Sequence, residues 1–452
     1  MKPVLSLLII ALTAVWSASA QLVMWGLAPA GYKQVEYLGF EMFKVVGPDG
    51  KASIVDGKGQ TLLEGTAFDT VTPFYDHWAL LLSNQSSNKQ RIVGCISTDK
   101  VCNAFPAENE YYTIEGQTFY SCGLLSVENR SGKKGYIDEE GELVIGFSSG
   151  FDKVMPFSED YAAVFKNGRF LLIDKFGESV TMVLPRVGEI RGGTNVYNGK
   201  AIVWDGSGHY YDYDVQTKSC SRRGKPSKNA TPDYLYRMTD KGDTPPYMAT
   251  DGRKGLSPTA SHGKYGYTSP EGKVLVPCQL TAASQFVDGY AIVKTGKGET
   301  GILWLDEHPA SGFNIRPVNP SIKYTAGETV TCSFTVTPPA NWPQQDINAS
   351  IDGLHVTTAD QGKTFSFKYA PTDQSKTFTV NILSHGLTLH ASTLSFNFSK
   401  KEGKAGSSSG KAKGKDKDKK EPSGKKDSSR GSKKSSGKQQ SREKETPKPK
   451  RL

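Results

Sequence analysis

The stretch GYIDEEGELVI at residues 135–145, followed by FDKVMPFSEDYAAV at residues 151–164, decides the fold because related stretches recur in this chain. Residues 50–59, GKASIVDGKG, align without a gap with residues 132–141, GKKGYIDEEG. A third copy begins with GKYGYTSPEGKVLVP at residues 263–277. An internal period of about 20–50 residues indicates stacked or radially arranged units, because a single unit cannot bury its own apolar face.

Each unit is expected to consist of short antiparallel strands. Residues 161–165 and 169–174 are β-branched and aromatic runs on either side of the turn sequence KNG, and a second turn, KFG, follows. Three or four strands in roughly 40 residues is the content of a propeller blade. We count about six or seven units, one of them a degenerate copy at residues 234–255. The fold is therefore predicted as all-β, a β-propeller-like array or, alternatively, an open β-solenoid.

The repeated pattern resembles a known family. A glycine–aromatic pair, Ile-Asp, a turn glycine, and Pro-Phe-Ser-Glu before Tyr-Ala-Ala-Val look like the WG-type repeats of bacterial proteins, over residues 35–308. In the best copy Gly135-Tyr136 stands where the Trp-Gly pair would be. The resemblance implies a propeller-like, mostly exported or surface protein, and it implies no shared catalytic residues.

After Asp306 the repeat pattern ends and longer alternating segments follow. This change predicts a second domain at residues 309–399 after a repeat domain at residues 21–308. Four longer alternating segments resemble the strands of an immunoglobulin-like β-sandwich. They are residues 328–336, 363–369, 376–383 and 393–398. Cys332 is the one cysteine in this region, so an inter-sheet disulfide cannot form there. Such a module usually serves as a spacer or in adhesion.

Residues 1–20 read as a cleaved export signal. Lys2 precedes an apolar run from Val4 to Val15, and Ala18-Ser19-Ala20 is the small-residue pattern of a cleavage site. A membrane anchor is the weaker reading, because the apolar run is shorter than the roughly 20 residues that a bilayer core requires. We expect the mature chain to begin near Gln21, to contain no transmembrane span, and to be periplasmic, outer membrane-associated or extracellular.

Residues 400–452 form a Lys-, Ser- and Gly-rich segment with 20 Lys or Arg and 7 Asp or Glu, a net charge of +13. Because the whole chain is +10, the other residues sum to −3. This composition predicts a disordered basic tail with anionic polysaccharide, lipopolysaccharide or anionic lipid as a partner, and no specific nucleic acid. A tail without any partner is nearly as well supported. The lysines expected to carry the electrostatic binding are Lys411, Lys413, Lys415, Lys417, Lys419, Lys420, Lys425, Lys426, Lys433 and Lys434.

One disulfide can be argued from spacing. If residues 97–100 form a hairpin turn, Cys95 lies directly opposite Cys102, near the separation that a bridge requires. Two free thiols on one sheet surface are the equally weighted alternative. The remaining cysteines and the seven histidines match no metal-binding or nucleophile motif. We therefore expect no catalytic residues, no metal and no cofactor.

Two recurrent residue classes admit a functional and a structural interpretation. Aspartates beside turn glycines could ring a channel, but capping their own turns is the better explanation. Recurrent aromatic residues could form a glycan platform, but packing between units is favoured. The residues concerned are Asp56, Asp69, Asp138, Asp152, Asp174, Phe74, Phe157, Phe286, Trp78, Tyr161 and Tyr290.

These observations favour an exported, non-enzymatic binding or scaffold protein of the cell envelope or surface, with a protein or surface polymer as partner. The repeat body would be the interaction platform and the tail an electrostatic tether. A carbohydrate-active or other hydrolytic propeller is the first alternative, and an acidic cluster at one end of the array would favour it. A passive spacer whose tail alone is functional is the second.

Overall fold

The computed structural model describes residues 21–84, 89–182, 189–225, 252–339, 342, 347–358, 360 and 362–401. The expected export signal, the tail from residue 402, and residues 234–251 of the expected degenerate unit lie outside these ranges. The described backbone is built of strands, with one short 3-10 helix, η1 (Phe147–Ser149). The all-β fold is thus confirmed.

The repeat array begins with a four-stranded sheet and a larger sheet of eight strands. The first has the order β2-β3-β4-β5, and in the second the order is β13-β12-β11-β10-β8-β7-β6, with β9 paired to β8. Their bounds are β2 (Gln34–Gly39), β3 (Met42–Val46), β4 (Ala52–Asp56), β5 (Thr61–Leu63), β6 (Thr70–Val71), β7 (Trp78–Asn84), β8 (Gln90–Ser97), β9 (Cys102–Ala104), β10 (Tyr111–Thr113), β11 (Leu125–Glu128), β12 (Lys134–Ile137) and β13 (Leu143–Ile145).

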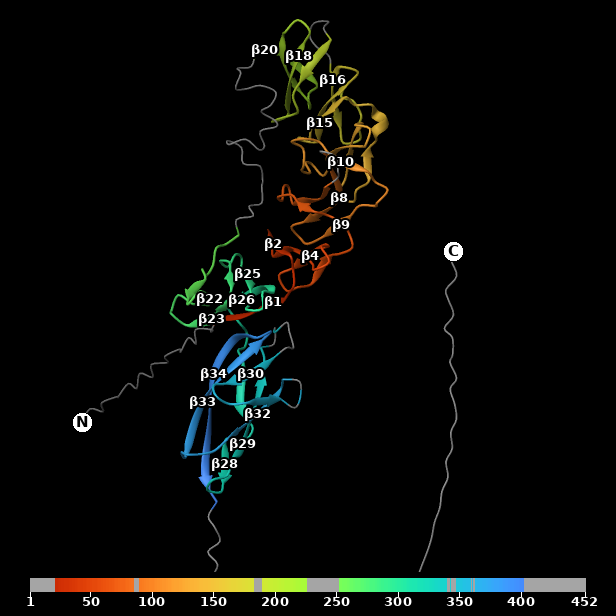
Figure 1. The fold of residues 1–452 in the computed structure, drawn as a ribbon. Helices are drawn as coiled ribbons and strands as arrows, with labels where there is room; N and C mark the ends of the chain where they lie inside the picture. Colours follow the sequence, from red (N-terminus) through yellow and green to blue (C-terminus); the bar gives the residue numbers. More distant parts are fainter. Residues whose placement is uncertain are drawn as a thin grey trace, which may run out of the picture. The chain divides into compact units, whose positions relative to one another are not determined.

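Four smaller sheets complete the array (Figure 1). Three have the orders β14-β15-β16, β17-β18-β19-β20 and β21-β22-β23, and the fourth has the order β1-β26-β25-β24. The bounds are β1 (Leu22–Ala30), β14 (Lys153–Val154), β15 (Tyr161–Lys166), β16 (Arg169–Asp174), β17 (Ile190–Gly193), β18 (Lys200–Asp205), β19 (Tyr210–Asp214), β20 (Ser219–Arg223), β21 (Thr259–Ser261), β22 (Lys264–Thr268), β23 (Val274–Leu280), β24 (Ala282–Ala283), β25 (Tyr290–Lys294) and β26 (Thr300–Asp306).

A tight turn marks the start of each unit. Its two central residues both have positive φ, as a type I′ hairpin turn requires. In the described residues, pairs of this kind that recur along the array are Phe40-Glu41, Asp76-His77, Cys122-Gly123, Glu159-Asp160, Asn198-Gly199 and Asp288-Gly289. Asn167-Gly168, His262-Gly263 and His385-Gly386 form further turns with two positive φ values. The first five recurring pairs lie roughly 40 residues apart, the period of a propeller blade. The sixth follows at about twice that interval, which leaves room for the degenerate unit.

The N-terminal strand joins the first unit to the last. β1 pairs antiparallel with β26, from Leu22 opposite Asp306 to Ala30 opposite Thr300, and so adds the fourth strand to the closing sheet (Figure 1). This pairing covers an edge of the sheet that would otherwise carry unpaired backbone groups. The two ends of the repeat sequence therefore share one sheet, which is the propeller-like feature of the array.

The repeat glycine allows two backbones to approach closely. A Cβ atom on Gly94, Gly135 or Gly266 would lie 2.4, 2.5 or 2.3 Å from a carbonyl oxygen of the neighbouring strand. The register shifts at the pairings of β12 with β13 and of β22 with β23, close to two of these positions. A side chain cannot be placed there without moving the backbone, which explains why glycine recurs at this point of the repeat.

The aromatic residue after that glycine packs on the next unit. The ring of Tyr136 lies 4.8 Å from that of Phe157, edge to face, and its hydroxyl donates to the carbonyl oxygen of Met155 at 2.8 Å. Tyr267 repeats both contacts, with Phe286 at 4.7 Å and with the carbonyl oxygen of Ser284 at 2.7 Å. All four rings are fully buried.

The predicted packing role of the recurrent aromatic residues is therefore confirmed for Phe157 and Phe286, and Phe74 is likewise fully buried. Tyr290 is buried beside Phe43, at 5.7 Å between ring centroids. Trp78 and Tyr161 are half-buried and pack against neighbouring apolar clusters. These rings hold the units together, so they do not form an exposed glycan platform.

Two further four-stranded sheets follow the array and share one apolar core, which includes the buried Cys332. Their orders are β27-β29-β32-β31 and β28-β34-β33-β30. The bounds are β27 (Asn314–Pro317), β28 (Ser321–Tyr324), β29 (Val330–Thr337), β30 (Asn348–Ile351), β31 (Val356–Thr358), β32 (Thr364–Tyr369), β33 (Ser375–Ser384) and β34 (Leu387–Lys400). The four alternating segments expected from the sequence correspond to β29, β32, β33 and β34.

The hairpin between β33 and β34 is anchored in the closing sheet. Trp25 Nε1 donates to the carbonyl oxygen of Ser384 at 3.2 Å in a buried contact, and Leu387 and Leu389 belong to the same apolar cluster as Trp25 and Val276. The described residues up to Lys401 accordingly form one compact unit.

We expect Gly135→Ala to lower the free energy of unfolding by about 1–3 kcal/mol, because the added methyl group forces Ile145 and its strand to move. Denaturant unfolding of the two proteins measures this difference. Gly296→Ala is the control, since its Cβ would meet nothing within 4 Å. Equal stability losses in the two variants would contradict the close-approach explanation.

Candidate binding cleft in the repeat array

A cleft opens in the eight-stranded sheet where two successive units meet. β10 pairs with β8 through Tyr111 opposite Ile92 and Tyr112 opposite Arg91, and the residues just beyond these pairs border the cavity. The cavity has a volume of about 750 Å³. We call it the Glu128 cleft. It is lined by Lys89, Gln90, Thr113, Ile114, Glu115, Thr118, Glu128 and Lys134.

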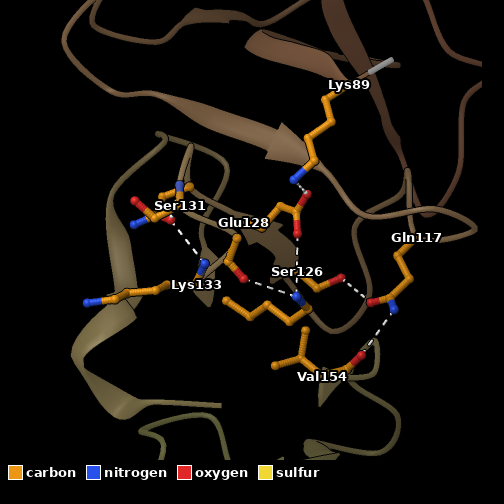
Figure 2. Close-up of polar contacts among 10 residues, drawn as sticks. Lys89, Gln117, Ser126, Glu128, Ser131, Lys133 and Val154 are labelled. Carbon is orange, nitrogen blue, oxygen red and sulfur yellow. Dashed lines mark hydrogen bonds and ion pairs between the residues drawn. The ribbon is translucent and has the colours of Figure 1, made fainter. Parts of the chain in front are cut away.

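Glu128, the last residue of β11, lies between Lys89, which immediately precedes β8, and Lys134, the first residue of β12. Its Oε1 is 2.5 Å from Lys89 Nζ and its Oε2 is 3.4 Å from Lys134 Nζ (Figure 2). The Glu128 side chain is 12% exposed, whereas that of Lys89 is 45% exposed. The Lys89–Glu128 pair joins the unit of β7–β9 to the unit of β11–β13. Glu128, the least exposed of the three charged side chains, therefore connects the two units at the cleft.

A buried hydrogen-bond chain supports the strand that carries Glu128. Ser126 Oγ donates to Gln117 Oε1 at 2.5 Å, and Gln117 Nε2 donates to the carbonyl oxygen of Val154 at 3.0 Å (Figure 2). Ser126 and Gln117 are both buried. Since Val154 belongs to β14, the chain ties the wall of the cleft to the next sheet. A buried, satisfied polar network of this kind favours one arrangement of the wall.

The hairpin before β12 positions Lys134. Asn129 Oδ1 accepts hydrogen bonds from the backbone N–H groups of Ser131 and Lys133, each at 3.0 Å, which holds the turn closed. Lys134 Nζ also donates to the carbonyl oxygen of Gly132 at 3.1 Å. The ammonium group is thereby held at the cleft wall by its own turn.

A second pocket, of about 390 Å³, gathers four carboxylates near the closing sheet. Asp288 accepts hydrogen bonds from the Tyr37 hydroxyl at 2.5 Å and the Arg253 backbone N–H at 2.6 Å. Burial, followed by the hydrogen bond with Asp288, raises the pKa of Tyr37 well above its usual range. The pocket also contains Glu41, Asp306 and Glu307.

Each of those three carboxylates has a partner as well. Glu307 pairs with Arg253 Nη2 at 2.7 Å, and Glu41 pairs with Lys100 at 2.8 Å. Asp306 Oδ1 accepts from the backbone N–H of His308 at 3.0 Å. An acidic cluster at one end of the array is the feature that would favour a hydrolase. In this pocket each carboxylate already accepts a hydrogen bond or pairs with a cation from a neighbouring residue.

Three of the five recurrent aspartates cap their own turns, as the sequence predicts. Oδ1 of Asp56, of Asp138 and of Asp174 accepts the backbone N–H four residues later, at 2.7, 2.8 and 2.9 Å. Asp69 and Asp152 act across a hairpin, accepting from the N–H groups of Asn84 and Gly168. The predicted capping of their own turns is thus confirmed for Asp56, Asp138 and Asp174, whereas Asp69 and Asp152 bond backbone groups 15 and 16 residues away.

The predicted pairing of Cys95 with Cys102 is wrong. Cys95 lies opposite Asn103, and Cys102 lies opposite Ile96, so the two side chains point to opposite faces of the sheet. The loop contains one more residue than the four-residue turn we assumed: the Ser97 N–H donates to the carbonyl oxygen of Val101. Both cysteines are free thiols, and burial raises the pKa of Cys95 to about 12 and that of Cys102 to about 11.

Sequence reasoning did not identify the Glu128 cleft. Glu128 and Lys134 come from β11 and β12, Lys89 immediately precedes β8, and Gln117 lies in a loop. The one local signal is the charged Glu128 at the end of β11, a position where β7 and β15 carry Asn84 and Lys166. The ten predicted tail lysines lie outside the described residues. Where the structure describes the chain, no group of three or more His, Cys, Asp or Glu could hold a metal ion.

Comparisons with known proteins agree with the repeat assignment. Residues 135–170 and 265–298 match the family model for the WG containing repeat. These segments overlap the second and third copies found by internal alignment. The search of curated proteins gives no match. Among the described residues, no helix is long and apolar enough to cross a membrane.

Several solved β structures match at low identity. The WD40 β-propeller domain of Doa1 is 13% identical, with 63% of this chain and 96% of that chain covered and a TM-score of 0.20. YCF48 from Cyanidioschyzon merolae is 11% identical, with coverages of 62% and 98% and a TM-score of 0.22. The extracellular domain of the hybrid two component system BT3049 from B. thetaiotaomicron is 10% identical, with coverages of 81% and 68% and a TM-score of 0.18. At these scores the matches carry no functional argument.

Glu128→Gln is expected to lower the free energy of unfolding by about 1–2 kcal/mol, because it removes the negative charge between Lys89 and Lys134. The matched control is Glu41→Gln, which disrupts the more exposed pair with Lys100 and should change stability by at most about 1 kcal/mol. Thermal and denaturant unfolding give both differences. Equal losses of unfolding free energy in the two variants would show that the partial burial of Glu128 does not strengthen its ion pairs.

A thiol-reactive maleimide added to the native protein at neutral pH should label Cys122 and Cys278 before Cys95 and Cys332. The last two are fully buried, and burial raises the pKa of both thiols. Peptide mapping under non-reducing conditions measures the labelling and should show no peptide pair joined through Cys95 and Cys102. Detection of a peptide pair linked through Cys95 and Cys102 would contradict the structure and support the disulfide predicted from spacing.

Proposed function

We propose that this chain is an exported, non-enzymatic binding or scaffold protein of the cell envelope or surface. Its repeat array binds a protein or surface-polymer partner through the Glu128 cleft. The two-sheet segment after the array is an immunoglobulin-like spacer, and the basic tail tethers the protein to an anionic polymer or membrane.

The Glu128 cleft is the observation that carries this proposal. Its volume falls within the roughly 300–1,000 Å³ that ligand pockets occupy. Its walls come from two successive units and are held by the Lys89–Glu128 pair and the Ser126–Gln117–Val154 chain. A rigid wall loses little conformational freedom when a partner binds, which favours affinity.

The lining of the cleft suits a polar partner with charges of both signs. Its described lining residues include two lysines, two glutamates and two threonines, and among them Ile114 is the one apolar residue. Glycan sites commonly use an aromatic surface for stacking, and the aromatic rings of the repeat are committed to packing between units. A peptide segment with side chains of both charges therefore fits these walls better than a neutral sugar.

Binding accounts for the structure better than hydrolysis does. Glycoside hydrolysis needs a pair of carboxylates free to exchange protons with the substrate. In the acidic pocket Asp288 accepts two hydrogen bonds, and Glu41 and Glu307 are each paired with a cation. We accordingly assign this pocket to the closing sheet as a structural element.

The tail and export proposals rest on the sequence. The net charge of +13 after residue 399 provides long-range attraction to anionic surfaces, which salt screens over about 10 Å at 0.1 M. The first strand, β1, begins at Leu22, just after the expected cleavage site at Ala20. Cleavage there would leave every strand of the array in the mature chain. A function carried by the tail alone is the alternative that the following experiment separates.

The experiment is a pull-down from envelope extract with three immobilised proteins at low and high ionic strength. They are the mature chain, a variant with Thr118→Arg in the cleft wall, and a variant with the ten named tail lysines changed to glutamine. Thr331→Arg, on an exposed position of β29, is the matched control for the added charge. Unfolding curves of all proteins establish that each is folded.

We expect a partner that is retained by the mature chain and the Thr331→Arg control at high salt and is lost with Thr118→Arg. The tail variant should lose only contacts that salt also removes. If every partner disappears with the tail charges, the function belongs to the tail. A salt-resistant partner that ignores Thr118→Arg would place recognition outside the cleft.

A further inference from the structure

The sheet β17-β18-β19-β20 packs on the preceding unit through one of its faces. Val203 and Tyr211 belong to the same apolar cluster as Phe170 of β16. Because side chains alternate along a strand, the adjacent residues Trp204 and Tyr210 lie on the other face. None of the apolar clusters formed by the described residues includes either ring. The face that carries these rings is therefore not part of the apolar core between the described units.

Trp204 and Tyr210 form an aromatic strip across this face. Trp204 lies directly opposite Tyr210 in the strand register, and their ring centroids are 5.8 Å apart with an interplanar angle of 37°. The indole also lies over Gly192 of β17, where an added Cβ atom would be 2.2 Å from Cζ2 of Trp204. Glycine at this position lets the indole lie against the neighbouring strand. Both rings are half-buried.

Two phenylalanines form the matching pair in the preceding unit. Phe165 lies directly opposite Phe170, with 5.6 Å between the ring centroids. Both belong to the cluster shared with the sheet β17-β18-β19-β20, and a Cβ atom on Gly193 of that sheet would be 2.4 Å from the Phe170 ring. The aromatic pair of this hairpin is therefore an interface position, through which one unit contacts the next. Trp204 and Tyr210 stand at the same position one unit later.

An ion pair lies beside the two rings on this face. Arg223, directly opposite Tyr210, pairs through Nη1 with Asp212 at 2.6 Å, and the two side chains are 30% and 32% exposed. In the preceding unit the residue at the position of Asp212 is the fully buried Leu172. A guanidinium and a carboxylate suit a hydroxyl-bearing partner better than the apolar face of another repeat unit, because each needs hydrogen-bond partners.

We propose that Trp204, Tyr210, Asp212 and Arg223 form a second binding site, which takes a neutral, extended β-linked hexose chain. The C–H faces of neighbouring pyranose rings can stack on two aromatic rings at this separation, which is comparable to the spacing of successive sugars in such a chain. Asp212 offers acceptors and Arg223 donors to the sugar hydroxyl groups. The two charges cancel, so the ligand needs none. This site is separate from the Glu128 cleft and does not depend on export.

The test is isothermal titration calorimetry of cellohexaose, a β-linked glucose hexasaccharide, into the mature chain and four variants. Trp204→Ala removes the larger ring, Trp204→Phe keeps an aromatic ring at this position, and Arg223→Gln removes the guanidinium. Phe176→Ala is the matched control, because it removes an 84% exposed ring from the preceding unit. Unfolding curves verify that each protein is folded.

We expect the mature chain and the Phe176→Ala control to bind cellohexaose with equal affinity. Trp204→Ala should weaken binding about tenfold, Trp204→Phe should weaken it less, and Arg223→Gln should also weaken it. If Trp204→Ala does not fold, Trp204→Phe and Arg223→Gln decide the outcome. Absence of binding by the folded mature chain would overturn the proposal. Binding that none of the substitutions at Trp204 and Arg223 weakens would overturn it as well, because recognition would then lie elsewhere.

Discussion

The edge-to-face packing of a tyrosine from one unit on a phenylalanine of the next is the contact on which the array depends. Tyr136 meets Phe157, and Tyr267 meets Phe286, with the hydroxyl of each tyrosine donating to a carbonyl of the following unit. Because the rings are fully buried only when both units are present, each unit supplies part of its neighbour's core. The glycine before the tyrosine lets the adjacent strand approach closely enough for this packing.

The sheet of β26 draws on several distant segments as well. β1 covers the edge of β26, and the hairpin between β33 and β34 adds Leu387 and Leu389 to the core beneath it. Three segments far apart in sequence thus complete one sheet and its core. The Glu128 cleft lies away from this junction, in a sheet whose walls are held by neighbours on both sides.

Features that depend on neighbouring residues were predictable. The aspartates at turns could be assigned because their hydrogen bonds join backbone groups two to four positions away. The pairing of Cys95 failed because the number of residues in the connecting loop, which sets the register, cannot be read from composition. The Glu128 cleft was missed because Lys89, Glu128 and Lys134 meet only after the four strands β8, β10, β11 and β12 have paired.

The sequence by itself determined that the chain is an all-β repeat with a period of roughly 40 residues, turn aspartates, buried aromatic positions and a strongly basic end. These are consequences of local propensity, spacing and charge, which need no knowledge of distant contacts. Only the tertiary structure decided that β1 completes the last sheet, that Trp25 bonds a carbonyl 359 residues away, and that a cleft opens between two units. Such features depend on which distant surfaces bury one another, and many sequences with the same local pattern could pair them differently.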